Sequence, residues 1–419
     1  MLLRPAQVSQ VLKAAFGKRS TANPPTAPNH TVGGGKPLFS ENTLAGPLVQ
    51  DLDAWLQLAL FLLYERQQGQ SSAWQGYVSS LPVHVDTPLS WTEEELAPLQ
   101  GSQLYANLQG YRDFFKDLHE RLSASLFQQH QVHFAAEAFS FDKFIWAVQT
   151  VRSRVHSPLE GKSIALVPLA DLVKHRRAGK SRWKVQSGLF GGSQAVTVDA
   201  VSPLEAGEFL AMDFGPDKLD SSLLLDYGVL DASSPQAGFL LSLGLPEQDR
   251  FFDDKADVLD LNGLAESWQF TLRPSQKPSS DLMAFLRLLN LTGPDSFLLE
   301  ALFRNEAWGH LSLPVSEENE AAVCRSMLDG CTEALQGYVS SIDEDLAALR
   351  NEGLPPRAAK AVQVCLGEKE SLEYTLQWFE THYKSLDKLE YYQERRLKGL
   401  GLMDDAGRNT WDDLEDGIA

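Results

Sequence analysis

A short block of strand-like sequence between long helical stretches most constrains the fold of this chain. From Lys162 to Tyr227, short apolar, β-prone runs alternate with Gly-rich or charged turns. The runs cover residues 163–167, 194–198 and 208–212. On either side, apolar residues recur at three- and four-residue spacing, which is typical of amphipathic helices. The pattern predicts an α+β fold in which helices surround a small sheet.

The helical stretches fall into two groups. Before the strand-like block, helices are expected from about Leu48, over 104–127 and over 140–151, with Thr92 placed to cap a short helix. After Leu245 they are expected at 282–291, 317–339, 342–350, 357–366 and 368–398. Cys324 and Cys331 lie seven residues apart, so both fall on one helix face and are expected in the core. The second group predicts an all-α domain.

Composition excludes several classes of function. The chain has 419 residues and a formal charge of -19, which argues against direct binding to a nucleic-acid backbone. No apolar run is long enough to span a membrane. The three cysteines form no CxxC pair, so neither a disulfide framework nor a metal site is expected.

The first forty residues differ from the rest in charge. They contain five basic side chains and no acidic one, whereas the chain as a whole is acidic. Organelle transit peptides show this bias. A Pro- and Gly-rich loop inside a truncated domain would explain it equally well, so both interpretations stay open.

Three motifs around the strand-like block resemble one known family. They are Trp146-Ala-Val-Gln-Thr-Val-Arg-Ser153-Arg154, then Leu166-Val-Pro-Leu-Ala-Asp171-Leu-Val-Lys174-His175, and finally Asp213-Phe214-Gly-Pro followed by Leu223-Leu-Leu-Asp226-Tyr227-Gly228. In this order and spacing they resemble the SET-domain protein-lysine methyltransferases of the Rubisco large-subunit type. The downstream motifs Val315-Ser-x-x-Asn-Glu320 and Gly367-Glu-Lys369 are similar to the helical substrate-binding domain of that family.

The resemblance implies a site for each participant in lysine methylation. Tyr227 would place its hydroxyl beside the transferred methyl group, and Phe214 would line the substrate-lysine channel with it. The resemblance assigns the S-adenosylmethionine site to Ser153, Arg154, Asp171, Lys174 and His175. A dry aromatic channel would lower the pKa of the substrate lysine, which must lose its proton before it can attack.

Three departures from the family pattern bear on activity. Lys174 stands where the family has asparagine, and Phe214 stands where most members have tyrosine. The Gly-rich turn with which the family begins its SET fold is not found ahead of Leu3. These departures leave two hypotheses: a protein-lysine N-methyltransferase that uses S-adenosylmethionine, or a catalytically impaired SET-domain scaffold. The wording of 226–231 and 391–397 resembles the SET-domain subunit of the plastid RNA polymerase assembly, which would be the partner of such a scaffold.

The resemblance also predicts the domain organisation. Residues 1–245 would form a SET domain with a helical insert at about 45–135, residues 246–403 a helical substrate-binding-like domain, and residues 404–419 an acidic tail. The expected partner is a protein substrate or protein complex, with no membrane. The expected compartment is the plastid, with the cytoplasm or nucleus as alternatives.

Overall fold

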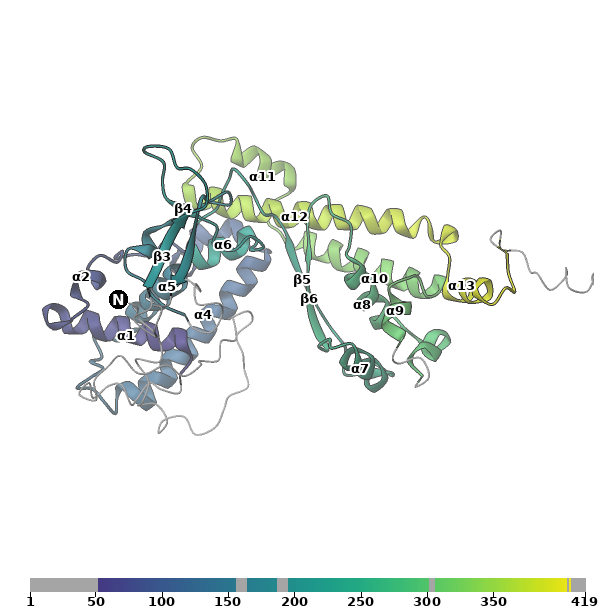
Figure 1. The fold of residues 1–419 in the computed structure, drawn as a ribbon, viewed down its shortest axis with the longest axis horizontal. Coiled ribbons are helices and arrows are strands. Elements are labelled where there is room, and N and C mark those ends of the chain that lie inside the picture. Colours follow the sequence, from purple (N-terminus) through teal and green to yellow (C-terminus); the bar gives the residue numbers. More distant parts are fainter. Residues whose placement is uncertain (1–51, 156–163, 187–194, 301–305, 405–406, 408–419) are drawn as a thin grey trace, which may run out of the picture. The chain divides into compact units, whose positions relative to one another are not determined.

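The computed structural model describes residues 52–155, 164–186, 195–300, 306–404 and 407 (Figure 1). The basic N-terminal segment, the start of the expected insert and nearly all of the acidic tail lie outside these residues. The chain forms two compact units. Unit 1 contains residues 52–99, 104–236 and 355–361, and unit 2 contains residues 100–103, 237–354 and those from 362 onward.

Unit 1 is organised around helix α1 (Ala54–Gln68). Leucines on all sides of α1 are buried, as expected for a helix inside a core. It packs against α5 (Phe141–Arg154), and α5 packs in turn against α6 (Asp220–Tyr227). The shorter helices are α2 (Gln75–Val78), α3 (Glu93–Leu96) and α4 (Gln103–Leu122), the last of which begins in unit 2.

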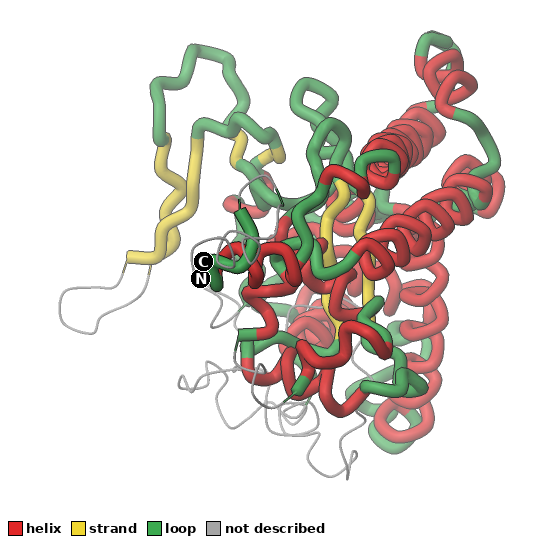
Figure 2. The backbone as a smooth tube through the Cα atoms, turned by 90° about the vertical axis from the view of Figure 1, so that its right-hand side faces the viewer, coloured by secondary structure: helices red, strands yellow, loops and turns green. Residues whose placement is uncertain are grey.

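The strands of unit 1 form two small ladders (Figure 2). Strand β1 (Lys174–His175) pairs in parallel with β4 (Ala211–Met212). Strands β2 (Ser181–Gln186) and β3 (Ala195–Ala200) pair antiparallel, with Trp183 opposite Val198. The β1–β4 ladder brings the segments around 175 and 213 together, although they are far apart in sequence.

Unit 2 combines one antiparallel ladder with helices. Strand β5 (Phe239–Gly244) pairs with β6 (Ser267–Leu272). The helices are α7 (Phe252–Leu261), α8 (Ser280–Leu289), α9 (Ala307–Leu311), α10 (Glu317–Gln336), α11 (Ile342–Leu349), α12 (Pro356–Tyr383) and α13 (Tyr392–Gly399). The first residues of α12 belong to unit 1.

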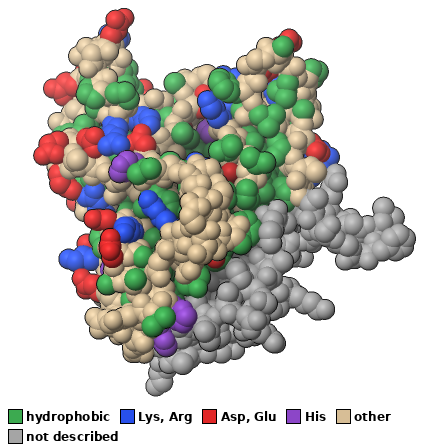
Figure 3. Space-filling model, turned by 90° about the vertical axis from the view of Figure 1, so that its left-hand side faces the viewer, with side chains coloured by type: hydrophobic (Ala, Val, Ile, Leu, Met, Phe, Trp, Pro, Cys, Tyr) green, Lys and Arg blue, Asp and Glu red, His purple; other side chains and the backbone are tan. Residues whose placement is uncertain are grey.

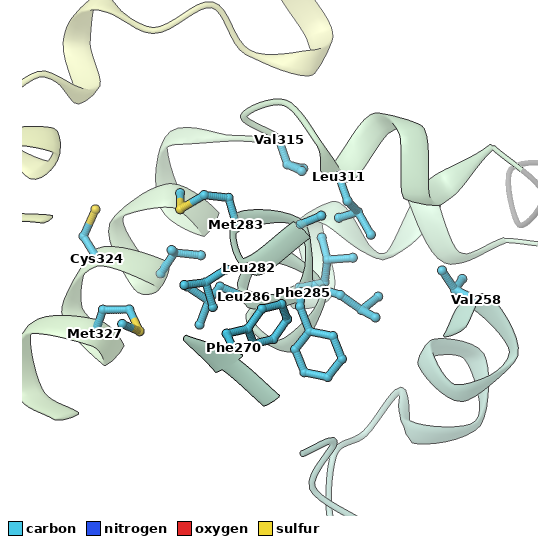
Figure 4. Packing of buried hydrophobic residues seen from close by; sticks show 14 of the residues in the cluster. Val258, Phe270, Leu282, Met283, Phe285, Leu286, Leu311, Val315, Cys324 and Met327 are labelled. Carbon is cyan, nitrogen blue, oxygen red and sulfur yellow. The ribbon is translucent and has the colours of Figure 1, made fainter. Parts of the chain in front are cut away.

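The core of unit 2 is built on α8. Figure 4 shows Phe285 of α8 beside Phe270 of β6, and their ring centroids are 5.7 Å apart. Cys324 is buried in this cluster, and so is Cys331 further along α10, as the sequence predicts. Burial raises the pKa of Cys331 to about 11, so its thiol stays protonated at neutral pH.

The structure confirms the α+β class with a helical C-terminal region and corrects four local predictions. The Leu-rich run before Tyr227, which falls within the block expected to be strand-like, is helix α6. Strand β6 adds a ladder to a region expected to be all helical. In the runs at 163–167 and 208–212, the described residues form only a bridge at Ala165–Leu166 and the short strand β4. The helices expected at 357–366 and 368–398 run together through Gly367 as α12, which ends at Tyr383, and the remainder of the second one is the separate helix α13.

On the face shown in Figure 3, acidic and basic side chains are interspersed.

Thr92 caps α3 as predicted, in a capping box with Glu95. Within the described part of the chain, no helix combines the length and apolarity needed to cross a bilayer.

Candidate active site

Helix α6 ends at the residue expected to be catalytic, and the residue after it must be glycine. Gly228 has a left-handed φ of 68° and donates its N–H to the Leu224 carbonyl, which ends the helix. A Cβ atom at this position would lie 1.8 Å from the Asp86 carbonyl oxygen. The Gly228 carbonyl accepts a hydrogen bond from Lys360 Nζ at 2.8 Å. The conformation of Gly228 thus fixes the end of α6 at Tyr227.

Three aromatic rings lie together at this helix end. The rings of Phe214 and Tyr227 have centroids 4.7 Å apart, and those of His175 and Phe214 have centroids 5.1 Å apart. No hydrogen bond is recorded for the Tyr227 hydroxyl among the described residues. Burial, reinforced by the neighbouring Asp226 carboxylate, raises the pKa of Tyr227, so the phenol stays protonated. The arrangement offers an apolar wall with a single hydroxyl.

His175, the third member of this group, also has a buried side chain. Its side chain is 1% exposed, although its position ahead of two arginines would suggest a surface residue. The ring Nδ1 accepts a hydrogen bond from the main-chain N–H of Phe214 at 3.2 Å. The neutral ring therefore carries its proton on Nε2. Burial lowers the pKa of His175, so this neutral form predominates.

Two features of His175 leave polar groups without a protein partner in the described part of the chain. Its Nε2 is buried and has no hydrogen-bond partner among the described residues. Its neighbours Lys174 and Arg176 donate their main-chain N–H groups to Leu210 and Met212. In a parallel ladder, every second residue of a strand bonds to the same neighbouring strand. Lys174 and Arg176 bond toward β4, so the main-chain N–H and carbonyl of His175, which lies between them, point away from β4.

A cluster of three polar side chains joins α5 to the segment before β1. Arg154 Nη1 lies 3.2 Å from Asp171 Oδ2, and the Tyr77 hydroxyl donates to the same oxygen at 2.9 Å. The Asp171 side chain is almost fully buried. Ser153 is engaged within its own helix, because its hydroxyl donates to the Gln149 carbonyl at 2.8 Å.

Lys174 points its charge at an aromatic ring. Its Nζ lies 3.8 Å from the ring centroid of Phe209, which is 70% exposed. Such a contact contributes roughly 0.5–1 kcal/mol at an exposed site. The side chain of Lys174 therefore lies on the surface, while its main chain belongs to β1.

Two arginines that hold the site together were not singled out from the sequence. Arg152 pairs with Asp226 at 2.5 Å, and Lys218 lies 3.3 Å from the other oxygen of that carboxylate. Arg152 follows Val148 by one turn on the buried face of α5, and a cation in such a position needs a carboxylate. That spacing is the signal that could have identified it.

Arg177 is the second of these arginines, and it is buried although it lies in a basic run of sequence. Its side chain is 5% exposed. Its guanidinium donates to the carbonyl oxygens of Gly215 and Lys218 at 2.8 and 2.5 Å, and lies 3.5 Å from an Asp220 oxygen. Arg177 thus holds the segment after Phe214 against the start of α6.

The residues of unit 1 fit the expected cofactor. The buried Nε2 of His175 is a donor without a protein partner in the described part of the chain, and the outward edge of β1 offers one main-chain donor and one acceptor. Such a pair suits a planar heterocycle like adenine. The Arg154–Asp171 pair supplies further polar groups from α5. Of the predicted site residues, His175, Phe214 and Tyr227 lie together, and Arg154 and Asp171 form a second group.

Comparisons with known proteins agree on one family. Residues 246–372 match the family model described as the Rubisco LSMT substrate-binding domain. A chloroplastic [fructose-bisphosphate aldolase]-lysine N-methyltransferase of Arabidopsis thaliana is 37% identical over 366 residues, which are 86% of this chain and 76% of that protein. A chloroplastic ribulose-1,5 bisphosphate carboxylase/oxygenase large subunit N-methyltransferase of Nicotiana tabacum is 35% identical over 86% of this chain and 74% of that one. The structure of Rubisco LSMT bound to S-adenosylmethionine superposes with a TM-score of 0.77 at 34% identity, covering 90% of this chain and 85% of that one.

Proposed function

Since this chain belongs to the SET-domain protein-lysine methyltransferases of the Rubisco large-subunit type, we propose that it methylates a lysine side chain of a plastid protein. The cofactor of the family is S-adenosylmethionine. When bound, that cofactor supplies an electrophilic methyl group on a sulfonium sulfur. The compartment is proposed because the two relatives described above are chloroplastic.

The substrate amine must reach the site without its proton. The rings of Phe214 and Tyr227 are in contact, with centroids 4.7 Å apart, and such an apolar wall would exclude water from a side chain that lies against it. Removal of water disfavours the charged ammonium and lowers its pKa from about 10.4. The neutral amine then has a free lone pair with which to attack the methyl carbon.

The Tyr227 hydroxyl orients this attack. Because burial keeps the phenol protonated, the hydroxyl can both donate and accept hydrogen bonds. Its oxygen carries a partial negative charge that favours the positive charge shared between sulfur and nitrogen during transfer. The Phe214 ring contributes shape but no hydroxyl, so Tyr227 supplies the one hydroxyl of this aromatic pair.

The cofactor would be held by the polar groups around β1. His175 would contribute its Nε2–H and its main-chain edge, and Lys174 its main chain alone. Arg154 and Asp171 would contribute from α5 and the segment before β1, with Tyr77 fixing the Asp171 carboxylate. Ser153 would act only through its place at the helix end, since its hydroxyl is already bonded.

One observation supports the proposal more than any other. Tyr227, Phe214 and His175 come from separate segments of the chain, yet their rings lie in contact, and the buried Nε2 of His175 faces no protein acceptor in the described residues. The comparisons give no support to a purely structural role. A plastid RNA polymerase partner therefore stays a prediction from sequence.

The test is methyl transfer by the purified chain. Fructose-bisphosphate aldolase and the Rubisco large subunit, each produced unmethylated in bacteria, would be incubated with S-adenosylmethionine and analysed by mass spectrometry. We expect a methylated lysine in at least one of them. Tyr227→Phe should lower kcat by about 100-fold, because it removes a hydroxyl aimed at developing charge.

Tyr383→Phe is the matched control, since Tyr383 lies on α12 in unit 2 and is 41% exposed. Its kcat should equal that of the wild type. Failure of the wild-type chain to bind S-adenosylmethionine in calorimetry, together with no transfer to either protein, would contradict the proposal and favour the scaffold hypothesis.

A further inference from the structure

A cavity in unit 2 is lined by none of the methyl-transfer residues. It has a volume of about 450 Å³. Its lining residues are Lys277, Pro278, Ser279, Ser280, Met283, Arg287, Ser312, Trp378 and His382. They come from the β6–α8 connection, from α8, from the end of α9 and from the C-terminal half of α12. Most of them fall within the stretch matched as a substrate-binding domain.

Two of the polar residues that line this cavity, Lys277 and Trp378, carry donors without acceptors of their own in the described part of the chain. Lys277 is exposed, and no ion pair is recorded for it among the described residues. The Trp378 indole N–H likewise makes no hydrogen bond to the described residues. An ammonium and an indole N–H can only donate, so the ligand they suit must accept.

The carboxylate behind the cavity wall is already neutralised. Glu320 receives two hydrogen bonds from Arg287, both at 2.8 Å, and lies 2.8 Å from His382 Nε2. Its side chain is fully buried. Its pKa is lowered by these partners against the effect of burial, so it remains an anion paired with them. The cavity thus gains no free negative charge from Glu320.

The walls also suit a side chain rather than a small ion. Trp378 stacks on His382 with ring centroids 4.8 Å apart, and Met283 and Pro278, which also line the cavity, are buried. Flat and apolar walls of this kind contact the methylenes of a glutamate. Arg287, the residue best shaped to hold a phosphate, has its fork occupied by Glu320.

We propose that this cavity binds a carboxylate side chain in an acidic segment of the protein substrate, with Lys277 and Trp378 as its donors. The proposal rests on the proposed function, because it names what the methyltransferase recognises away from the reacting lysine. The N-terminus of α8 is capped by Ser279 and carries Asp281 in its first turn, so the donors for the ligand are Lys277 and Trp378 rather than the helix end. The chain carries a net charge of -19 and as a whole repels acidic partners. The Lys277 ammonium, which lines the same cavity as Trp378, is a local positive charge that would attract one.

The experiment measures binding of a fluorescein-labelled oligoglutamate peptide to the full chain by fluorescence anisotropy. Lys277→Glu should weaken binding by about tenfold or more, the scale of one charge-assisted contact. Trp378→Phe, which keeps an aromatic ring but removes the N–H, should weaken it by about threefold. Lys388→Glu is the control, because it makes the same change of charge at an exposed position of unit 2 outside the cavity.

Each outcome decides the proposal. Loss of binding in Lys277→Glu and Trp378→Phe but not in Lys388→Glu supports it. No binding by the wild type, or equal weakening by both charge reversals, overturns it. Inorganic phosphate and free glutamate would also be added as competitors. If phosphate displaces the peptide at the same concentration as glutamate does, the cavity is a small-anion site, and the proposal is overturned. The assay contains neither S-adenosylmethionine nor a substrate lysine, so its result is independent of whether methyl transfer occurs.

Discussion

The imidazole Nδ1 of His175 accepts a hydrogen bond from the Phe214 main-chain N–H at 3.2 Å, and the two rings lie in contact. This bond joins the end of β1 to the segment that follows β4 and sets the tautomer of the histidine. Protonation of His175 would place a hydrogen on Nδ1 and break the bond. The residue expected to hold cofactor is therefore also a pH-sensitive link.

Stability should fall in acid through His175. Its pKa in the folded chain is lowered, so below the unfolded value of about 6.5 the unfolded chain binds a proton that the folded chain does not. The free energy of unfolding then decreases as pH falls, by at most about 1.4 kcal/mol per pH unit. Urea unfolding at pH 7.5 and 5.5 should show a smaller decrease for His175→Gln than for the wild type.

The charged groups around His175 are the same in the wild type and in His175→Gln, so they do not by themselves distinguish the two proteins. Asp213, Arg177, Asp231 and Asp220 act on His175. His84→Gln provides the control, since His84 is exposed and its variant should show the wild-type decrease. An equal decrease in His175→Gln and the wild type would show that His175 does not carry this pH dependence.

Arg152 should stabilise unit 1 more than Lys218 does, although both pair with Asp226. Arg152 makes the shorter contact and is the more buried partner, and its guanidinium also lies 4.5 Å from the Tyr111 ring centroid. Arg152→Met should lower the free energy of unfolding by about 2–3 kcal/mol, because it leaves a poorly solvated carboxylate. Lys218→Met should cost less than about 1 kcal/mol.

Denaturant unfolding of both variants, alone and combined with Asp226→Asn, measures the coupling. Once Asp226 is an amide, loss of Arg152 should cost clearly less than it does alone. If Arg152→Met and Lys218→Met cost the same, the assignment of Arg152 as the main partner is wrong.

The sequence predicted those parts of the fold that follow from local spacing. Phe144, Val148 and Val151 recur at helical intervals, and α5 forms where they predict it. The run Leu223–Leu225 carries no such alternation, so a buried strand and a buried helix could not be distinguished. Gly228 decides for the helix, because its left-handed conformation ends α6 against Asp86.

Long-range partners explain the remaining errors. The guanidinium of Arg177 finds its acceptors at Gly215 and Lys218, which no local pattern relates to it. Gly367 predicted a break in a helix, yet a Cβ atom there would lie 2.8 Å from that of Ala237, so the glycine serves close packing. The motifs identified Tyr227 and His175 as candidates, but only the fold shows that their rings share Phe214 as a neighbour.

Restoring the family amide at position 174 should strengthen cofactor binding. Lys174→Asn removes a cation near the site proposed for a sulfonium ligand. In the wild type, the Lys174 ammonium contacts the exposed ring of Phe209. We expect about threefold tighter binding of S-adenosylmethionine in calorimetry, since exposed charges interact by less than about 1 kcal/mol. Lys184→Asn on β2 is the control for loss of charge and should leave the affinity unchanged. Unchanged or weaker binding by Lys174→Asn would show that Lys174 does not impair this site.

Gly228→Ala should disrupt the end of α6 and with it the position of Tyr227. Two costs add at this residue: a left-handed φ of 68° and a Cβ atom 1.8 Å from the Asp86 carbonyl oxygen. Gly263 separates them, because its φ is 67° and a Cβ atom added there would meet nothing within 4 Å. Gly263→Ala should cost about 1 kcal/mol from backbone strain alone. Gly228→Ala should cost at least about 3 kcal/mol in urea unfolding, since the backbone around Asp86 must move. Equal costs for the two variants would mean that the contact with Asp86 relaxes freely and does not fix Tyr227.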